Sequence, residues 1–317
     1  MRIVFMGTPD FAAASLKALI ETQHQIVGVV TQPDKPKGRG KQVQPPPVKV
    51  LALENSLPVY QPVSIKTDEF LEQLKLLQPQ CIVVVAYGKI LPREILHLPP
   101  LGCVNVHASL LPYYRGAAPI HWAVINGEKE TGVTTMYMDE GMDTGDMILK
   151  GTIPIGPDDT VGMIHDRLAA QGAKLLVETL GLMGQGKAPR QSQNHTSATY
   201  APMLRKEHEP IDWQGQAKDI HNHVRGMDPW PGAFTTWEGQ VLKIWKTGVP
   251  APLMLSACPG TVLELQTGGI LVQTGYGQIL IKELQLQGSK RMEASRFLRG
   301  KQITPGTVLS MKGLRVS

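Results

Sequence analysis

The sequence predicts an α/β protein in which a Rossmann-like parallel sheet domain is followed by a smaller OB-like β-barrel domain. Apolar, β-branched runs at residues 2–6 and 25–31 flank a segment of helical periodicity at residues 10–21, and strand, helix, strand at this spacing form a βαβ unit. About five short strand-like runs between residues 233 and 286 are separated by glycine turns, which is typical of a small barrel. A length of 317 residues also favours two domains over one.

The first domain is expected to span residues 1–187. Its opening turn, Gly7-Thr8-Pro9, carries one glycine and not the three of a dinucleotide-binding fingerprint, so a dehydrogenase is disfavoured. The central strand should be apolar on both faces, as strands inside a parallel sheet are. The further elements are expected as a helix at 67–77, strands at 81–86 and 103–107, a helix near 119–126, a strand at 132–138 and a closing helix at 160–183.

Residues 188–204 are polar and lack periodicity, so we interpret them as a linker, and residues 205–317 as the second domain. This domain should also contain helices at residues 216–225 and 292–298. It holds 14 Lys and Arg against 9 Asp and Glu, which accounts for the whole net charge of +5. A basic surplus is commonly a solvated face, but its confinement to one domain also suits a polyanionic partner.

Compartment and membrane attachment follow from composition. The sequence has no apolar run of 18 or more residues, and its first residues read as a strand and not as a signal peptide. Its three cysteines are far apart and lack the spacing of a metal site. We therefore expect a cytoplasmic protein without membrane attachment, and we expect it to be a monomer.

The strand expected at residues 103–107 ends in polar side chains. Because side chains alternate along a strand, Val104 and Val106 face one side while Asn105 and His107 face the other. A loop containing proline, arginine and glycine follows, and an open α/β sheet binds its ligand beside such a strand end. A lone histidine there is commonly a hydrogen-bonded structural residue, but the neighbouring asparagine favours a functional site.

Two motifs carry a resemblance to a known family. Asn105-x-His107 is followed by Ser-Leu-Leu-Pro-x-Tyr-Arg-Gly at residues 109–116, and Asp-x-Gly-x-Asp-x-Gly occupies residues 139–145. Together they resemble the signature of the folate-dependent formyltransferases. The resemblance implies an enzyme with 10-formyltetrahydrofolate as co-substrate, tetrahydrofolate as product, no tightly bound cofactor, and Asn105, His107 and Asp143 as catalytic residues.

The chemistry assigns these three residues different tasks. Asn105 is expected to donate to the oxyanion that forms on the formyl group, and His107 to donate to the same oxygen or carry the proton. Asp143 would orient His107 and favour its charged form. Whether His107, Asp143 or a bound water moves the proton stays open. A calcium loop is the alternative for the aspartate-rich segment, but its spacing is not that of an EF-hand and no glutamate closes it, so we expect no metal.

Folate contacts are implied by the resemblance on two segments. One follows the catalytic strand, and the other follows the central strand, where main-chain groups and Ile or Leu side chains would line the pteridine pocket. Taken alone, the second segment is equally consistent with a simple strand-to-helix turn. The implied residues are Ser109, Leu110, Leu111, Pro112, Tyr87, Lys89, Ile90 and Leu91.

A basic insertion at residues 32–47 interrupts the alternation of strands and helices. It contains Lys35, Lys37, Arg39 and Lys41 without an apolar stripe, and composition alone predicts an ordinary mobile surface loop. The run Gln-Pro-Asp followed by Gly-Arg-Gly-Lys is similar to the inserted loop of those formyltransferases that engage the tRNA acceptor stem. The resemblance thus implies that the four residues bind tRNA, and that formyl is transferred to methionine on initiator methionyl-tRNA for translation initiation.

Two alternatives remain. The first is another enzyme that uses 10-formyltetrahydrofolate, either glycinamide ribonucleotide formyltransferase or another formyltransferase or hydrolase. It would share the three catalytic residues but not the basic insertion. A tRNA-binding protein without catalysis would share the basic surplus, but would not require Asn105, His107 and Asp143 together.

Overall fold

The computed structural model describes residues 1–37, 42–251 and 257–310, which fold into two compact units. The sequence pieces of the two units alternate along the chain. The first unit comprises Met1–Pro119, Glu130–Pro154 and His165–Ala201, and the second comprises Ile120–Lys129, Ile155–Ile164 and Pro202–Ser317. The domain boundaries at residues 187 and 204 stay a prediction.

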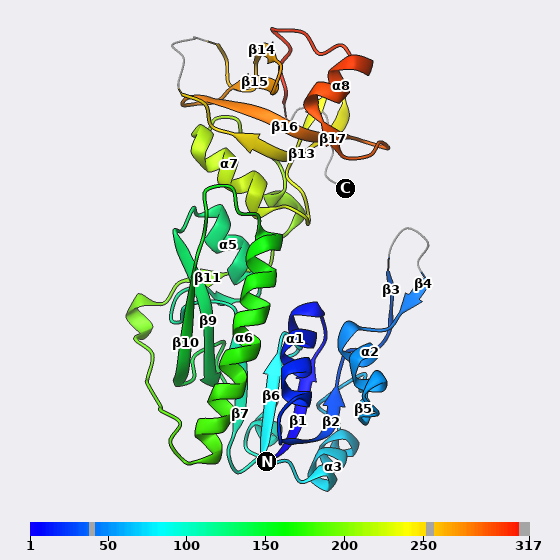
Figure 1. Cartoon of the computed structure of the whole chain (residues 1–317), viewed down its shortest axis with the longest axis vertical. Helices are drawn as coiled ribbons and strands as arrows, with labels where there is room; N and C mark the ends of the chain where they lie inside the picture. The colour runs from blue at the N-terminus through cyan, green and yellow to red at the C-terminus, as the bar shows by residue number, and fades with distance from the viewer. Residues whose placement is uncertain (38–41, 252–256, 311–317) are drawn as a thin grey trace. The chain divides into compact units, whose positions relative to one another are not determined.

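A sheet of order β10-β9-β7-β6-β1-β2-β5 forms the centre of the first unit (Figure 1). The strands β1, β2, β5, β6 and β7 pair in parallel, which confirms the predicted Rossmann-like sheet, while β9 and β10 are antiparallel. Of the two antiparallel strands, β9 was expected from the sequence and β10 was not, because the residues of β10 show no clear strand pattern. The strands are β1 (Arg2–Gly7), β2 (Gln25–Val30), β5 (Val59–Tyr60), β6 (Cys81–Val85), β7 (Cys103–His107), β9 (Glu130–Tyr137) and β10 (Met147–Pro154).

Helices cover both faces of this sheet. In Figure 1, α1 and α6 lie in front of the strands. On the opposite face, α3 and α4 bury Phe70, Leu74 and Ile95 in one core with apolar side chains of β1 and β6. Every residue of β6 is buried, as expected for a strand covered on both faces. The helices are α1 (Asp10–Ile20), α2 (Pro47–Glu54), α3 (Asp68–Leu77), α4 (Arg93–Leu96) and α6 (Val161–Gly184).

The packing of α6 fixes which way the side chains of β7 point. A Cβ at Gly172 of α6 would lie 3.0 Å from Val106 Cγ1, so the glycine lets the helix approach the sheet closely. On the other face, Cys103 Sγ contacts the carbonyl of Leu96 in α4 at 3.7 Å. Because Asn105 and His107 alternate in step with Cys103, they face away from α6, in agreement with the sequence pattern.

The basic insertion has more structure than its composition predicts. Lys35–Lys37 (β3) and Gln42–Gln44 (β4) pair as a two-stranded antiparallel ribbon, where we expected an irregular loop. At its base Asp34 forms an ion pair with Lys49 at 2.7 Å and accepts a hydrogen bond from Gln61. The hydrogen bonds from Lys49 and Gln61 lower the pKa of Asp34. The ribbon therefore starts from a fixed point on the sheet domain.

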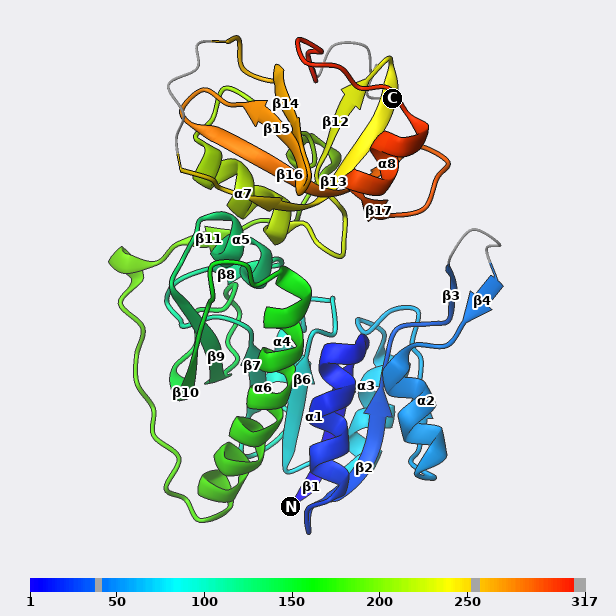
Figure 2. The same cartoon turned by 45° about the horizontal axis from the view of Figure 1, so that its top comes forward.

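A curved antiparallel sheet of order β12-β13-β16-β15-β14 forms the second unit, with β17 paired to β16 (Figure 2). Its two edge strands are bridged through residues 308–310, which pair with Thr261 on one side and Thr236 on the other. The predicted small β domain is confirmed. Its elements are β12 (Phe234–Trp237), β13 (Gln240–Gly248), β14 (Val262–Gln266), β15 (Gly269–Gln273), β16 (Gln278–Leu286), β17 (Met292–Glu293), α5 (Pro119–Ile125), η2 (Lys206–His208), α7 (Ala217–Gly226) and α8 (Ala294–Gly300).

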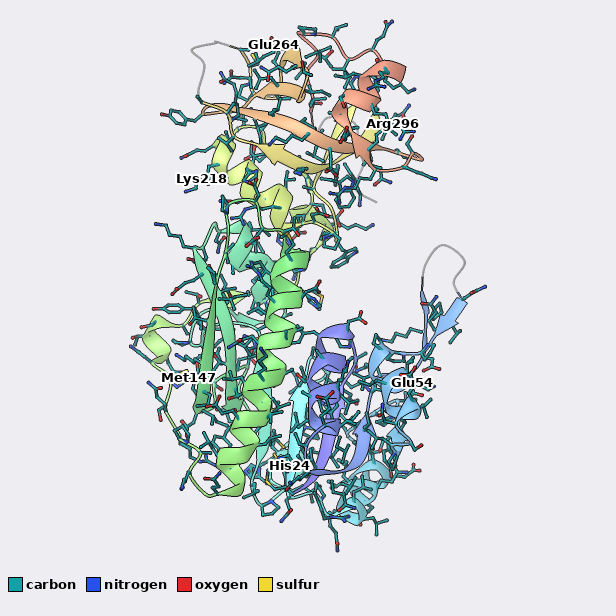
Figure 3. All side chains as sticks on the ribbon, viewed as in Figure 1. His24, Glu54, Met147, Lys218, Glu264 and Arg296 are labelled. Atoms are coloured by element: carbon teal, nitrogen blue, oxygen red, sulfur yellow. The ribbon has the colours of Figure 1, made fainter. Side chains whose placement is uncertain are left out.

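The core of the second unit is apolar and its helices carry basic residues outward. Trp213, Trp237 and Phe297 belong to one buried cluster with the inward side chains of the sheet. Lys218 of α7 and Arg296 of α8, both labelled in Figure 3, are exposed. Within the described ranges, every helix is too short or too polar to span a membrane.

Candidate active site

The site is centred on the carboxyl end of β7. His107 is 6% exposed, and Asn105 on the same face is half-buried. The strand pairs with β6 on one side and with β9 on the other. Asn105 is therefore paired on both sides, with Val84 and Met136, and His107 on one side, with Thr134.

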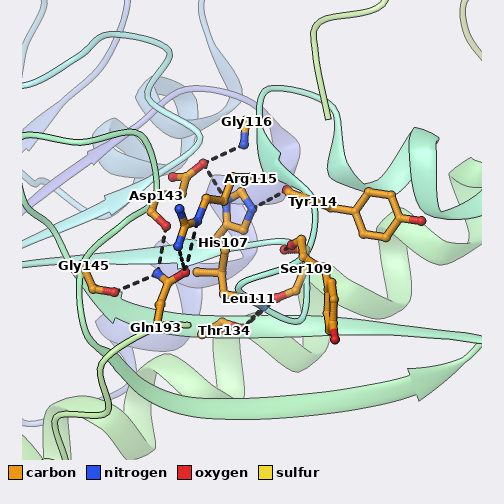
Figure 4. A network of polar contacts seen from close by, with 11 residues as sticks. His107, Ser109, Leu111, Tyr114, Arg115, Gly116, Thr134, Asp143, Gly145 and Gln193 are labelled. Atoms are coloured by element: carbon orange, nitrogen blue, oxygen red, sulfur yellow. Dashed lines mark hydrogen bonds and ion pairs between the residues drawn. The ribbon is translucent and has the colours of Figure 1, made fainter. Parts of the chain in front are cut away.

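The contacts of His107 define its tautomer (Figure 4). Nε2 lies 3.0 Å from the carbonyl oxygen of Tyr114, and since a carbonyl only accepts, Nε2 carries the hydrogen. Nδ1 lies 3.6 Å from Asp143 Oδ2, which is within electrostatic reach but longer than a hydrogen bond. Nδ1 is therefore the ring nitrogen that faces the carboxylate.

Asp143 reaches this position from a loop with unusual backbone geometry. Its φ is 54°, in the left-handed region that non-glycine residues rarely adopt. Its Oδ2 accepts a 2.8 Å hydrogen bond from the amide of Gly116. The neighbouring carboxylates bind other donors: Asp139 accepts from Thr144, and Asp146 accepts from Ser192. The three aspartates of this loop thus do not converge on one point.

Two residues outside the predicted site join it. Gln193 Nε2 donates to the carbonyl oxygens of Asp143 and Gly145, both at 2.8 Å, and its Oε1 accepts from the buried Arg115 (Figure 4). Arg115 is the arginine of the Ser-Leu-Leu-Pro-x-Tyr-Arg-Gly motif, but the motif did not by itself assign it a role. Gln193 lies in the segment interpreted as a linker, and no local signal distinguishes it from other polar residues there.

The implied folate residues after β7 are tied into the sheet. Ser109 Oγ donates to the carbonyl of Tyr113 at 2.6 Å, and Thr134 Oγ1 binds both the Ser109 carbonyl and the Leu111 amide. The Leu111 side chain is fully buried and packs with Met136 and Met147. Its carbonyl accepts from Lys150 at 2.6 Å, and burial lowers the pKa of that lysine. The Leu111 side chain is therefore part of the core and is not exposed to a ligand.

The four implied folate residues after β6 differ in their exposure. Tyr87 and Leu91 are buried in the core beside α3 and α4, and burial raises the pKa of Tyr87 to about 12. The Lys89 ammonium binds the carbonyls of residues 62 and 63. Ile90, in contrast, is 78% exposed. Of these four side chains, that of Ile90 is the most available to a ligand.

A hollow of about 430 Å³ adjoins the same face of the sheet. Leu96 and His97 from the end of α4 line one side, and residues 138–141 line the other. One wall of the hollow, at residues 138–141, belongs to the loop that carries Asp143. The other wall lies close to β7, because Leu96 contacts Cys103, two residues before Asn105. Sequence reasoning placed no ligand contacts on Leu96, His97 or Met138, because each lies in an apolar stretch that also fits an ordinary core.

The residues implied in tRNA binding are placed in part. Lys35 lies on β3 and is exposed, and Lys37 ends the same strand. Arg39 and Lys41 fall outside the described residues.

Comparisons with known proteins agree with both halves of the sequence resemblance. The family model described as formyl transferase matches residues 1–180, and the model described as formyl transferase, C-terminal domain, matches residues 203–302. The chain is 71% identical over 315 residues to the methionyl-tRNA formyltransferase of Desulforamulus reducens, covering 99% of each chain. It is 57% identical over 309 residues to the methionyl-tRNA formyltransferase of Pelotomaculum thermopropionicum, covering 98% of each.

Solved structures share the fold at low sequence identity. The N-formyltransferase of Helicobacter canadensis, in complex with folinic acid and dTDP-3-aminofucose, has a TM-score of 0.66 at 20% identity and covers 88% of this chain and 98% of its own. HypX of Aquifex aeolicus, in complex with tetrahydrofolic acid, has a TM-score of 0.62 at 20% identity, covering 97% of this chain and 50% of its own.

Proposed function

The chain belongs to the formyl transferase family, and we propose on that premise that it transfers the formyl group of 10-formyltetrahydrofolate to the amino group of methionine on initiator methionyl-tRNA. The observation that carries the proposal is the convergence of Asn105, His107 and Asp143 at one strand end, in a chain so similar to methionyl-tRNA formyltransferases. 10-Formyltetrahydrofolate acts as a co-substrate and leaves as tetrahydrofolate. The product serves translation initiation.

The reaction requires one bond to form and one to break at the formyl carbon. The neutral methionine amine attacks that carbon, an oxyanion develops on the formyl oxygen, and the bond to folate N10 breaks as a proton moves from the amine to N10. The Asn105 amide can donate to the oxyanion, and a preorganised donor of this kind contributes about 3 kcal/mol. His107 accepts or releases a proton at Nδ1, and Asp143 stabilises the imidazolium that results.

We place the folate ring in the hollow beside α4. Leu96 and Met138 supply apolar walls and residues 139–141 supply polar groups, a combination typical of small-molecule sites. The exposed Ile90 and the main chain of residues 109–112 would contact the rest of the molecule. Replacing Met138 with Trp should narrow the hollow and raise KM for 10-formyltetrahydrofolate while KM for methionyl-tRNA stays the same. Equal changes in both constants would move the folate site elsewhere.

We place tRNA contacts on the basic ribbon and on the second unit. The ribbon starts from a fixed base, and Arg39, which lies between its two strands in the sequence, carries a planar guanidinium of the kind that suits phosphates or base edges. Arg39→Ala should lower turnover and the preference for initiator over elongator methionyl-tRNA. Replacing Lys218 and Arg296 with Ala should instead flatten the slope of log affinity against log salt, by roughly 0.7–0.9 for each phosphate that the protein no longer binds. A ribbon variant with normal turnover and preference would make the ribbon a plain surface feature.

Monomeric state and a cytoplasmic location are further parts of the proposal. Cys81 and Cys103 are buried free thiols, and burial raises the pKa of Cys81 to about 12, which suits a protein of a reducing compartment. Light scattering of the purified protein measures its mass and tests the monomer.

One assay tests the proposed activity directly. The protein is incubated with 10-formyltetrahydrofolate labelled in the formyl group, and with either initiator methionyl-tRNA or glycinamide ribonucleotide. We expect label in formylmethionyl-tRNA alone. Label in the ribonucleotide, or release of free formate without either acceptor, would identify another member of the folate-dependent formyltransferases.

A further inference from the structure

Arg115 is a fully buried cation whose guanidinium binds a neutral amide. It is 2% exposed, and its Nε and Nη2 donate to Gln193 Oε1 at 3.1 and 2.6 Å. Nη2 also lies 3.2 Å from His195 Nδ1, in the short helix η1 (His195–Ser197). Burying a charge is costly unless its donors are satisfied. A buried arginine with these partners therefore has a role inside the protein, unlike a surface arginine that only keeps the protein in solution.

The Gln193 amide uses all of its hydrogen-bonding capacity. Its oxygen accepts both bonds from Arg115, and its two N–H groups donate to the carbonyls of Asp143 and Gly145. The guanidinium can only donate and the carbonyls can only accept, so the amide has one possible orientation. Arg115 thereby sets which way Gln193 points, and Gln193 holds the loop on both sides of residue 144.

The neighbours of Arg115 in the chain contact the catalytic pair itself. The Tyr114 carbonyl accepts from His107 Nε2, and the Gly116 amide donates to Asp143 Oδ2. The segment is held in turn by pairing of β8 (Arg115–Gly116) with β11 (Tyr200–Ala201). Three consecutive residues thus contact the site (Figure 4): Tyr114 binds the imidazole, Arg115 binds the loop through Gln193, and Gly116 binds the carboxylate.

We propose that Arg115 and Gln193 are positioning residues for formyl transfer: Arg115 orients the Gln193 amide, and the amide clamps the Asp143 loop so that the carboxylate stays beside His107. This inference rests on the proposed function, which gives Asp143 its task. The clamp is needed because Asp143 has a left-handed backbone, which an L-residue leaves readily unless its surroundings hold it. The segment interpreted as a linker therefore supplies part of the active-site framework.

A purely structural role for the pair makes a different forecast, and Gln193→Glu separates the two. A glutamate would keep both acceptors for Arg115 and add charge pairing, but would lose the two donors to the loop carbonyls. The lost donors lower the thermal midpoint in either case. If the pair only stabilises the fold, the variant keeps its turnover at temperatures where it is fully folded. If the pair clamps the loop, turnover falls at those same temperatures.

The experiment compares Gln193→Glu and Gln193→Met with Gln191→Met as a matched control. Gln191 lies two residues earlier, its side chain is exposed, and it pairs with Met147 through its backbone. We expect the Gln193 variants to lose about 100-fold in kcat, as a misplacement of about 1 Å does, with KM for both substrates near the wild-type values. The control should behave as the wild type.

A second measurement does not depend on catalysis. The Gly116 amide is bonded to Asp143 Oδ2, so its hydrogen exchange, followed by NMR, reports whether the carboxylate keeps its place. Exchange at Gly116 should be faster in both Gln193 variants and unchanged in the control.

The outcomes separate this inference from the proposed function. A Gln193→Glu variant with normal kcat and normal Gly116 exchange overturns the clamp, and so does a variant in which KM for a substrate rises while kcat holds, because that assigns Gln193 to substrate binding. Wild-type protein that does not formylate methionyl-tRNA rejects the proposed function. Faster Gly116 exchange in the variants would then still support the clamp as a device that holds the loop.

Discussion

Gly145 offers a way to move Asp143 without touching any side chain of the site. An alanine at this position would place its Cβ 1.9 Å from the Tyr137 carbonyl oxygen, where real contacts stay at or above 3.0 Å. Tyr137 belongs to β9 and pairs with Val104 of β7, so the strand resists displacement. The loop must therefore shift by about 1 Å, the difference between the two distances.

A shift of this size is large compared with the contacts that hold Asp143. The hydrogen bond from the Gly116 amide and the bonds from Gln193 are all 2.8 Å long, and lengthening any of them by 1 Å breaks it. A misplacement of about 1 Å commonly costs about 100-fold in rate, which corresponds to about 2.7 kcal/mol in the activation free energy. We therefore expect Gly145→Ala to lower kcat about 100-fold.

The assay measures formylation of methionyl-tRNA at saturating substrates, with thermal unfolding measured alongside. Gly181→Ala in α6 is the matched control, because an ideal Cβ there meets nothing within 4 Å. In a helix interior this change should stabilise the fold by roughly 0.5–1 kcal/mol and leave kcat alone. If Gly145→Ala turned over as fast as Gly181→Ala, the position of the Asp143 loop would not limit the reaction.

The remaining predictions concern Asn105 on β7 and the pH dependence of stability. Asn105→Ala should lower turnover by about two orders of magnitude with tRNA affinity nearly unchanged. Steady-state kinetics measure the turnover and binding titrations measure the affinity. Normal turnover would remove Asn105 from the mechanism. Burial lowers the pKa of His223, whose Nε2 donates to the His208 carbonyl, so the unfolded state takes up this proton more readily than the folded state. Its contribution to stability is therefore present above the ordinary histidine pKa of 6.5 and is lost as pH falls below it, and His223→Gln should flatten this pH dependence in denaturant unfolding.

The parts of the molecule that a local pattern determines were predictable. Strict alternation placed Asn105 and His107 on one face of β7, and an entirely apolar run identified β6 as a central strand. Gln193 could not be found in this way, because its role depends on carbonyls about fifty residues earlier in the chain. The hollow beside α4 escaped for a similar reason, since Leu96 and Met138 look like core residues until the sheet brings them together.

The division of labour within the site follows the rigidity of its parts. Asn105 and His107 lie on a strand of the central sheet, which fixes their backbone, and the Tyr114 carbonyl holds the His107 ring as well. Asp143 lies on a loop with a left-handed backbone, and a loop carboxylate needs contacts from elsewhere to stay within about 4 Å of its partner. Those contacts come from Gly116 and Gln193, which lie on opposite sides of Asp143 in the sequence. Among substitutions that spare the three proposed catalytic side chains, those that loosen the Asp143 loop should therefore lower activity most, and those on the paired backbone of β7 should lower it least.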